Sequence, residues 1–118
     1  MTDPEETPNF FANRWLAWWT RRAMRRAARH LVAELKDQGV TGDYSFLGFH
    51  CDPVVWLVTR GDVERDKLLK SGLLRDLVVQ RLREAGVRLD LAEQAGATAE
   101  SQETVDRDFD GNWRHAMQ

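Results

Sequence analysis

The fold is decided by residues 41–62, TGDYSFLGFHCDPVVWLVTRGD. This stretch contains two runs of aromatic and β-branched residues, each bounded by glycine or aspartate, which is typical of strands. We predict strands over Tyr44–His50 and Val54–Arg60, separated at Pro53, because proline cannot donate to a sheet ladder. The second run is apolar on both faces, so we expect it to lie at the centre of the sheet.

A long helix is predicted before these strands, from Pro8 to Gln38. Pro8 suits a first helical position with Thr7 as its cap, and Gly39 suits a left-handed end. The apolar side chains of this helix form one stripe, which we expect to pack on the sheet. The stripe consists of Leu16, Ala23, Met24, Ala27, Leu31 and Leu35, with Trp19 at its edge.

A second helical region is predicted after the strands, over Val63–Ala85. Asp62 is a candidate N-cap and Gly86 a candidate end, while Ser71-Gly72 predicts a break or a kink inside the region. Its apolar stripe contains Leu68, Leu69, Leu73, Leu77, Val78 and Leu82.

The C-terminal part of the chain allows two interpretations. A strand near Ala95–Ser101 and a helical fragment both fit its pattern, and Asp110-Gly111 predicts a turn that leads into a final short strand. The order α-β-β-α-β, with or without that last strand, predicts an α+β fold with helices on a small, mostly antiparallel sheet. We expect one domain over residues 9–118, preceded by a flexible arm at 1–8.

The composition indicates a cytoplasmic, folded protein. Among the 118 residues, 42% are hydrophobic and 31% are charged, which suffices for a single core. The longest apolar run, Val54–Val58, is too short to span a bilayer, and the polar N-terminus does not resemble a signal peptide. A single cysteine excludes an internal disulfide framework. From the short apolar runs and the polar N-terminus we expect no contact with a membrane.

The charges are segregated along the chain although the net charge is only -2. Residues 10–33 contain six arginines, three of the five tryptophans and no acidic residue. Residues 89–118 contain seven acidic and two basic residues. Such blocks either neutralise one another within the fold or form two surfaces for partners.

The acidic C-terminal block is the first candidate for partner binding. Its side chains could imitate phosphates at the basic active site of a nuclease, and a tryptophan would anchor the contact. An ordinary solvated surface, or a partner for the arginine-rich helix within the same molecule, is an equally good interpretation. The candidate residues are Glu103, Asp106, Asp108, Asp110 and Trp113.

The arginine-rich helix is the alternative candidate. On a helical wheel Trp15 and Trp18 project among Arg21, Arg22 and Arg25, away from the apolar stripe, which allows cation–π contacts. Such a face can stack bases and bind phosphates, so it predicts nucleic-acid binding if it is exposed. If the acidic block covers it, the helix is structural. A membrane surface fits less well, because these tryptophans lie within the charged face and not opposite it.

We expect no catalytic residue, no cofactor and no metal ion. His50 and Cys51 are neighbours on a predicted strand and would point to opposite faces, so they do not make a catalytic pair. One cysteine and three histidines show no metal-ligand spacing. The pattern of Asp106, Asp108 and Asp110 matches the opening of an EF-hand loop, but Met117 stands where the closing glutamate belongs.

The chain resembles the small single-domain immunity proteins of bacterial toxin systems, including those of contact-dependent growth inhibition. The resemblance lies in the size, in the absence of a catalytic motif, and in two charged, tryptophan-bearing segments. These segments are RWLAWWTRR at residues 14–22 and ESQETVDRDFDGNWRHAM at residues 100–117. The resemblance implies a non-enzymatic protein that binds a cognate toxin and blocks its active site, and it implies no particular fold.

Overall fold

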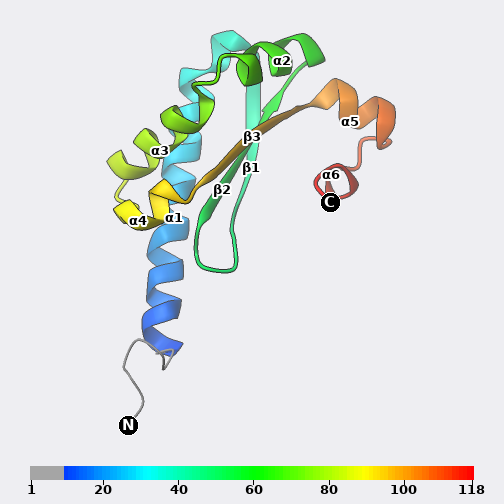
Figure 1. Cartoon of the computed structure of the whole chain (residues 1–118). Coiled ribbons are helices and arrows are strands. Elements are labelled where there is room, and N and C mark those ends of the chain that lie inside the picture. Colours follow the sequence, from blue (N-terminus) through cyan, green and yellow to red (C-terminus); the bar gives the residue numbers. More distant parts are fainter. Residues whose placement is uncertain (1–9) are drawn as a thin grey trace.

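The protein is an α+β domain, as the sequence predicts (Figure 1). The computed structural model describes the backbone of residues 10–118 and the side chains of residues 14–118, so the predicted arm at 1–8 and the cap at Thr7 lie outside the described residues. The elements are α1 (Phe10–Glu34), a 3₁₀ turn η1 (Lys36–Gln38), β1 (Val40–Leu47), β2 (Pro53–Thr59), α2 (Asp62–Lys70), α3 (Leu74–Glu84), α4 (Leu89–Glu93), β3 (Gly96–Ser101), α5 (Gln102–Asp108) and α6 (Trp113–Ala116).

The sheet is mixed, with strand order β1-β2-β3. Strands β1 and β2 form an antiparallel hairpin, and β3 runs parallel to β2. Parallel pairing needs a long crossover, which residues 60–95 supply with α2, α3 and α4. The central position predicted for the second strand is confirmed, but only one of the two pairings is antiparallel.

The first strand lies earlier in the chain than predicted. It runs over Val40–Leu47 and not over Tyr44–His50. The amide of Gly48 donates to the carbonyl of Asp52 at 2.8 Å, and Cys51 takes a left-handed φ of 62°. Residues 48–52 therefore form the hairpin turn.

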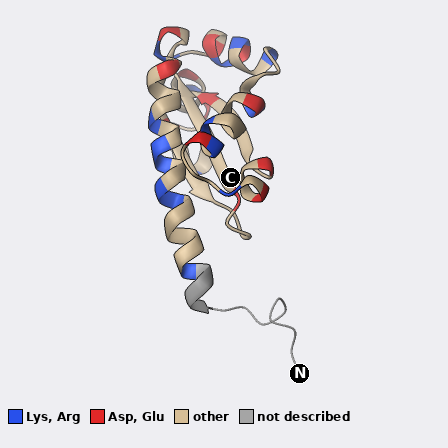
Figure 2. Ribbon diagram, turned by 90° about the vertical axis from the view of Figure 1, so that its left-hand side faces the viewer, with Lys and Arg blue, Asp and Glu red and all other residues tan. Residues whose placement is uncertain are grey.

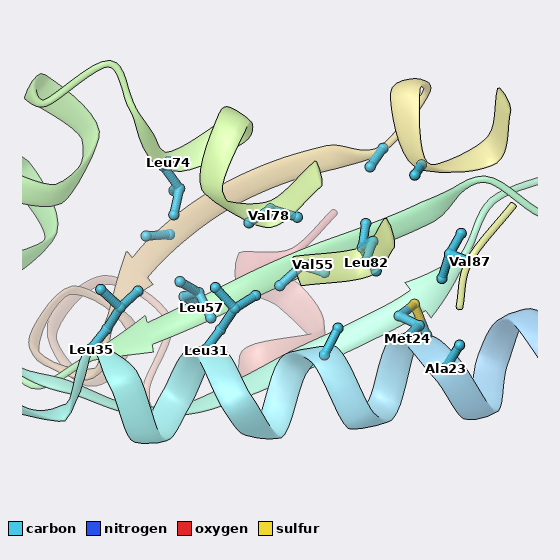
Figure 3. Close-up of a cluster of buried hydrophobic side chains, with 14 of the residues drawn as sticks. Ala23, Met24, Leu31, Leu35, Val55, Leu57, Leu74, Val78, Leu82 and Val87 are labelled. Atoms are coloured by element: carbon cyan, nitrogen blue, oxygen red, sulfur yellow. The ribbon is translucent and has the colours of Figure 1, made fainter. Parts of the chain in front are cut away.

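One face of the sheet forms the core together with α1 and α3. Figure 3 shows Leu31 and Leu35 pointing from α1 toward Leu57 of β2, with Val78 and Leu82 of α3 on the other side of the cluster. The predicted stripe of α1 is buried except for Leu16, which is half-buried. The sequence pattern of α1 is thus confirmed, because its period brings these side chains to one side.

The second helical region is divided as the glycine predicts. Gly72 has a φ of 69° between α2 and α3, and Gly86, with a φ of 101°, follows the end of α3. The predicted N-cap is wrong, however. Gly61 occupies the cap position in an extended conformation, and Asp62 is the first helical residue. The carboxylate of Asp62 instead binds groups of β3 and α5, described below.

The C-terminal part forms a strand followed by two short helices. β3 confirms the predicted strand, and the turn at Asp110 and Gly111 is present, with φ of 51° and 76°. The prediction of a final strand is wrong, because residues at the end of the chain form capped helices instead. The side chain of Ser101 accepts a hydrogen bond from the amide of Thr104, and the side chain of Asn112 accepts one from that of His115.

Candidate binding surfaces

The outer side of α1 carries a continuous surface of aromatic and cationic side chains. We call it the arginine–tryptophan face; it consists of Trp15, Trp18, Trp19, Arg21, Arg22, Arg25, Arg26 and Arg29, all exposed. The exposed fractions of the three tryptophans are 61%, 45% and 57%. Figure 2 shows the basic residues as successive bands along α1. This face exists because the opposite stripe of the helix is buried in the core.

The three tryptophans of this face form a packed ridge. Trp18 lies edge-on to Trp15, with ring centroids 6.0 Å apart, and edge-on to Trp19, with centroids 4.8 Å apart. The guanidinium of Arg22 lies 5.4 Å from the centre of the Trp18 ring, which confirms the predicted cation–π contact. The Trp18 ring is therefore in contact with Trp15, Trp19 and Arg22.

The arginines of this face have no acidic partner among residues 14–118. Within the part of the chain that the structure describes, none of Arg21, Arg22, Arg25, Arg26 and Arg29 forms an ion pair. The acidic residue at the end of α1 is engaged elsewhere, because Glu34 accepts a hydrogen bond of 2.8 Å from Arg81 of α3. This bond lowers the pKa of Glu34. The face thus presents five positive charges to solvent.

The acidic residues of the C-terminus lie away from α1. Glu103, Asp106, Asp108 and Asp110 are all exposed, on α5 and on the turn that follows it, and we call them the acidic segment. In Figure 1, α5 and α1 lie on opposite sides of the sheet. The interpretation that this segment covers the tryptophans of α1 is therefore wrong, because α5 lies on the far side of the sheet and Trp15, Trp18 and Trp19 are exposed.

A polar network joins β3 and α5 to α2. Asp62 accepts hydrogen bonds from the hydroxyls of Ser101 and Thr104, the latter at 2.5 Å. Arg107 donates to the same carboxylate at 3.1 Å, and Arg65 lies 3.6 Å from it. These bonds, led by that of Ser101, hold the pKa of Asp62 well below its usual range. Sequence reasoning missed this network, because its members lie about forty residues apart.

The contacts of Ser101 are those of a structural link. A serine nucleophile needs a base within hydrogen-bond reach that can take its proton. Ser101 is fully buried, and it donates to a carboxylate that is already engaged by three other residues. It also accepts from the amide of Thr104, which caps α5. The arrangement therefore fixes α5 against α2.

Trp113 lies against the outer face of the sheet. Its ring is tilted on that of Tyr44, with centroids 5.0 Å apart, and its indole N–H donates to Gln102 at 2.9 Å. Tyr44 pairs with Trp56, and Phe46 with Val54, in the β1–β2 register. The structure thus places the predicted anchor of the acidic segment beside aromatic residues of the sheet. Sequence reasoning missed this face, and the alternation of Tyr44 and Phe46 is the signal that could have revealed it.

The histidines and the cysteine do not come together into one site. His50 is exposed in the hairpin turn, where its amide donates to Asp52, while His30 lies on α1 and His115 on α6. Cys51 is half-buried and packs against the core. Over the described residues, no three histidine, cysteine or acidic side chains gather into a group that could hold a metal ion.

Comparison with protein-family models, with curated proteins and with solved structures gives no match. None of the helices within residues 10–118 has the length and apolar character needed to cross a membrane. The surfaces described above must therefore be interpreted from their own chemistry.

Proposed function

We propose that this chain is a non-enzymatic protein that binds an acidic protein partner through the arginine–tryptophan face. The observation that carries the proposal is the exposure of Trp15, Trp18 and Trp19 beside five exposed arginines that form no ion pair within the described part of the chain. Tryptophan and arginine are the residues most enriched at the energetic centres of protein interfaces. Exposed apolar patches of this kind are typical of interaction sites.

The spacing of the tryptophans supports a protein partner. Positions 15, 18 and 19 follow the i, i+3, i+4 pattern of a helix that inserts into a groove. Single-stranded nucleic acid needs free aromatic faces for stacking. Because Arg22 and both neighbouring tryptophans contact the ring of Trp18, this ring offers a base less open surface than the rings of Trp15 and Trp19 do.

We propose further that the partner is a toxin, as the resemblance to immunity proteins implies. Binding would then block the toxin without any chemistry in this chain, in the cytoplasm of the producing cell. The arginines require carboxylates on the toxin surface, since each buried charge needs a partner.

The test is complex formation with the products of the genes next to this one. We expect one of them to co-purify with the wild-type chain and to be inhibited by it. The triple variant Arg22→Glu, Arg25→Glu, Arg26→Glu should lose the complex, because it reverses charges at the centre of the face. The matched control is Lys67→Glu, Lys70→Glu, Arg83→Glu, which changes the net charge equally at exposed positions of α2 and α3.

Two results would contradict the proposal. One is the absence of a complex with any neighbouring product. The other is a complex that the triple variant forms as well as the control does. A gel shift of DNA or RNA that the triple variant alone abolishes, and that falls steeply with salt, would assign the face to nucleic acid instead.

A further inference from the structure

A groove opens between α1 and β1 beside the arginine–tryptophan face. Its volume is about 750 Å³. Val32 and Ala33 of α1 and Val40 and Gly42 of β1 line it with apolar surface. Three cationic residues, Arg29, Lys36 and Arg60, also line it. A ligand in this groove would meet both apolar surface and positive charge.

The groove is continuous with a second hollow on α1. Arg29 lines both, and the second hollow is formed with Trp18, Arg21, Arg22, Arg25 and Arg26. One surface thus runs from Trp18 to the groove. At 1.5 Å per residue, the helix from Trp18 to Lys36 is about 27 Å long, which an extended peptide covers in about eight residues.

The charges along this surface favour an acidic ligand. None of its seven cationic side chains forms an ion pair within the described residues. Two carboxylates line the groove, and one of them, Asp43, accepts a hydrogen bond of 2.6 Å from Ser45. Positive charge therefore dominates the hollow beside Trp18, and apolar contact dominates the groove.

We propose that the partner presents an extended acidic segment with an apolar side chain at one end. The carboxylates of this segment contact the arginines of α1, and its apolar side chain enters the groove between α1 and β1. This inference rests on the proposed function and adds the chemistry of the partner. It also assigns a specificity role to Val32, Val40 and Gly42, which the arginine–tryptophan face does not include.

Ala33 offers a direct test of the groove, because it lies at an exposed position of α1 and lines the groove. Ala33→Leu should therefore fill part of the groove. Val32→Phe, at a half-buried position of α1 that also lines the groove, is an independent second variant. Glu93→Leu on α4 is the control for an added leucine elsewhere.

The probes are two fluorescein-labelled peptides of ten residues. Each contains eight alternating glutamates and aspartates; one has phenylalanine at both ends and the other has serine. Fluorescence anisotropy at low salt should show that the wild type binds the phenylalanine peptide at least about tenfold more tightly, as an apolar side chain in a pocket implies. Both groove variants should remove this difference and leave the serine peptide unaffected, while Glu93→Leu should keep it.

The outcomes separate this inference from the proposed function. Equal affinities of the wild type for the two peptides, or a preference that Ala33→Leu and Val32→Phe both retain, would overturn the inference alone. Unchanged binding of both peptides by the Arg22, Arg25, Arg26 triple variant would contradict the proposed function. If a twelve-nucleotide oligothymidylate binds more tightly than either peptide at the same salt, the ligand of this surface is nucleic acid and not an acidic protein segment.

Discussion

Gly39 shows how a single residue combines a local and a distant constraint. It follows η1 with a φ of 91°, which glycine adopts readily. A Cβ at this position would also lie 2.5 Å from Cγ of Glu64 on α2. The sequence predicts the first constraint, because a glycine after an apolar helical stripe is a typical end. It cannot predict the second, which depends on how α2 packs.

Gly39→Ala should therefore destabilise the protein more than Gly86→Ala. Both residues have a left-handed φ, which costs an alanine about 1–2 kcal/mol. Only Gly39 adds the close approach of Glu64, whereas a Cβ at Gly86 meets open space. Urea denaturation of the two variants gives the comparison. Equal losses in the free energy of unfolding would show that α2 moves aside without cost.

Asp62 should make the stability of the protein sensitive to acid. Its folded-state pKa is lowered by the bonds from Ser101, Thr104 and Arg107, while its unfolded pKa is about 3.9. The stabilisation is therefore complete above about pH 4 and decreases as the pH falls below that value.

The variant Asp62→Asn should reduce stability at neutral pH and should flatten the loss between about pH 4 and pH 2. Thermal unfolding measured across this range, with Asp76→Asn on α3 as the control, tests the effect. An acid profile parallel to that of the wild type would mean that Asp62 contributes nothing to it.

At the scale of the elements, periodicity predicts α1 and its buried stripe, but competition between signals decides the C-terminus. Asp110-Gly111 is a good hairpin signal. The turn forms, but Ser101 and Asn112 cap two helices, so a helix and not a second strand follows it. Both short helices gain further contacts from the tertiary structure, such as the Trp113–Tyr44 stacking, which no single stretch of sequence contains.

The two sides of α1 should respond differently to truncation. Leu31→Ala should lower the free energy of unfolding by about 2–5 kcal/mol, because Leu31 is fully buried in the core. Trp18→Ala should cost much less, since 45% of its side chain is exposed. Urea denaturation measures both. A loss at Trp18 as large as that at Leu31 would make the outer side of α1 structural and would remove the basis for the proposed function.

At the scale of the whole molecule, the sequence predicts two charged blocks but not their relative positions. The bonds of Asp62 to Thr104 and Arg107 hold α5 against α2, and α5 lies on the opposite side of the sheet from α1 (Figure 1). Composition alone allows the blocks to neutralise one another. The exposure of Trp15, Trp18 and the arginines of α1 could be predicted from the helical wheel, but that of Trp19 could not, because it lies at the edge of the apolar stripe. The groove could not be predicted either, because α1 and β1 line it together.

The acidic segment remains the site that the sequence predicts for a basic toxin. If the partner binds α1 instead, its affinity should stay within about threefold of the wild type in the triple variant Asp106→Lys, Asp108→Lys, Asp110→Lys. These residues are exposed, so the fold should persist. Titration calorimetry with the co-purified partner decides between the two surfaces. A complete loss of binding by this variant would transfer the interface to α5.

The separation of the two charged surfaces has a further physical consequence. Five exposed arginines on one side of the sheet and four carboxylates on the other give the molecule a large electric dipole, although its net charge is only -2. Such a molecule orients itself in a field before it makes contact. At low salt it should adhere to a cation-exchange resin at pH 7, above its isoelectric point of about 5.9, because the resin meets the arginine side first.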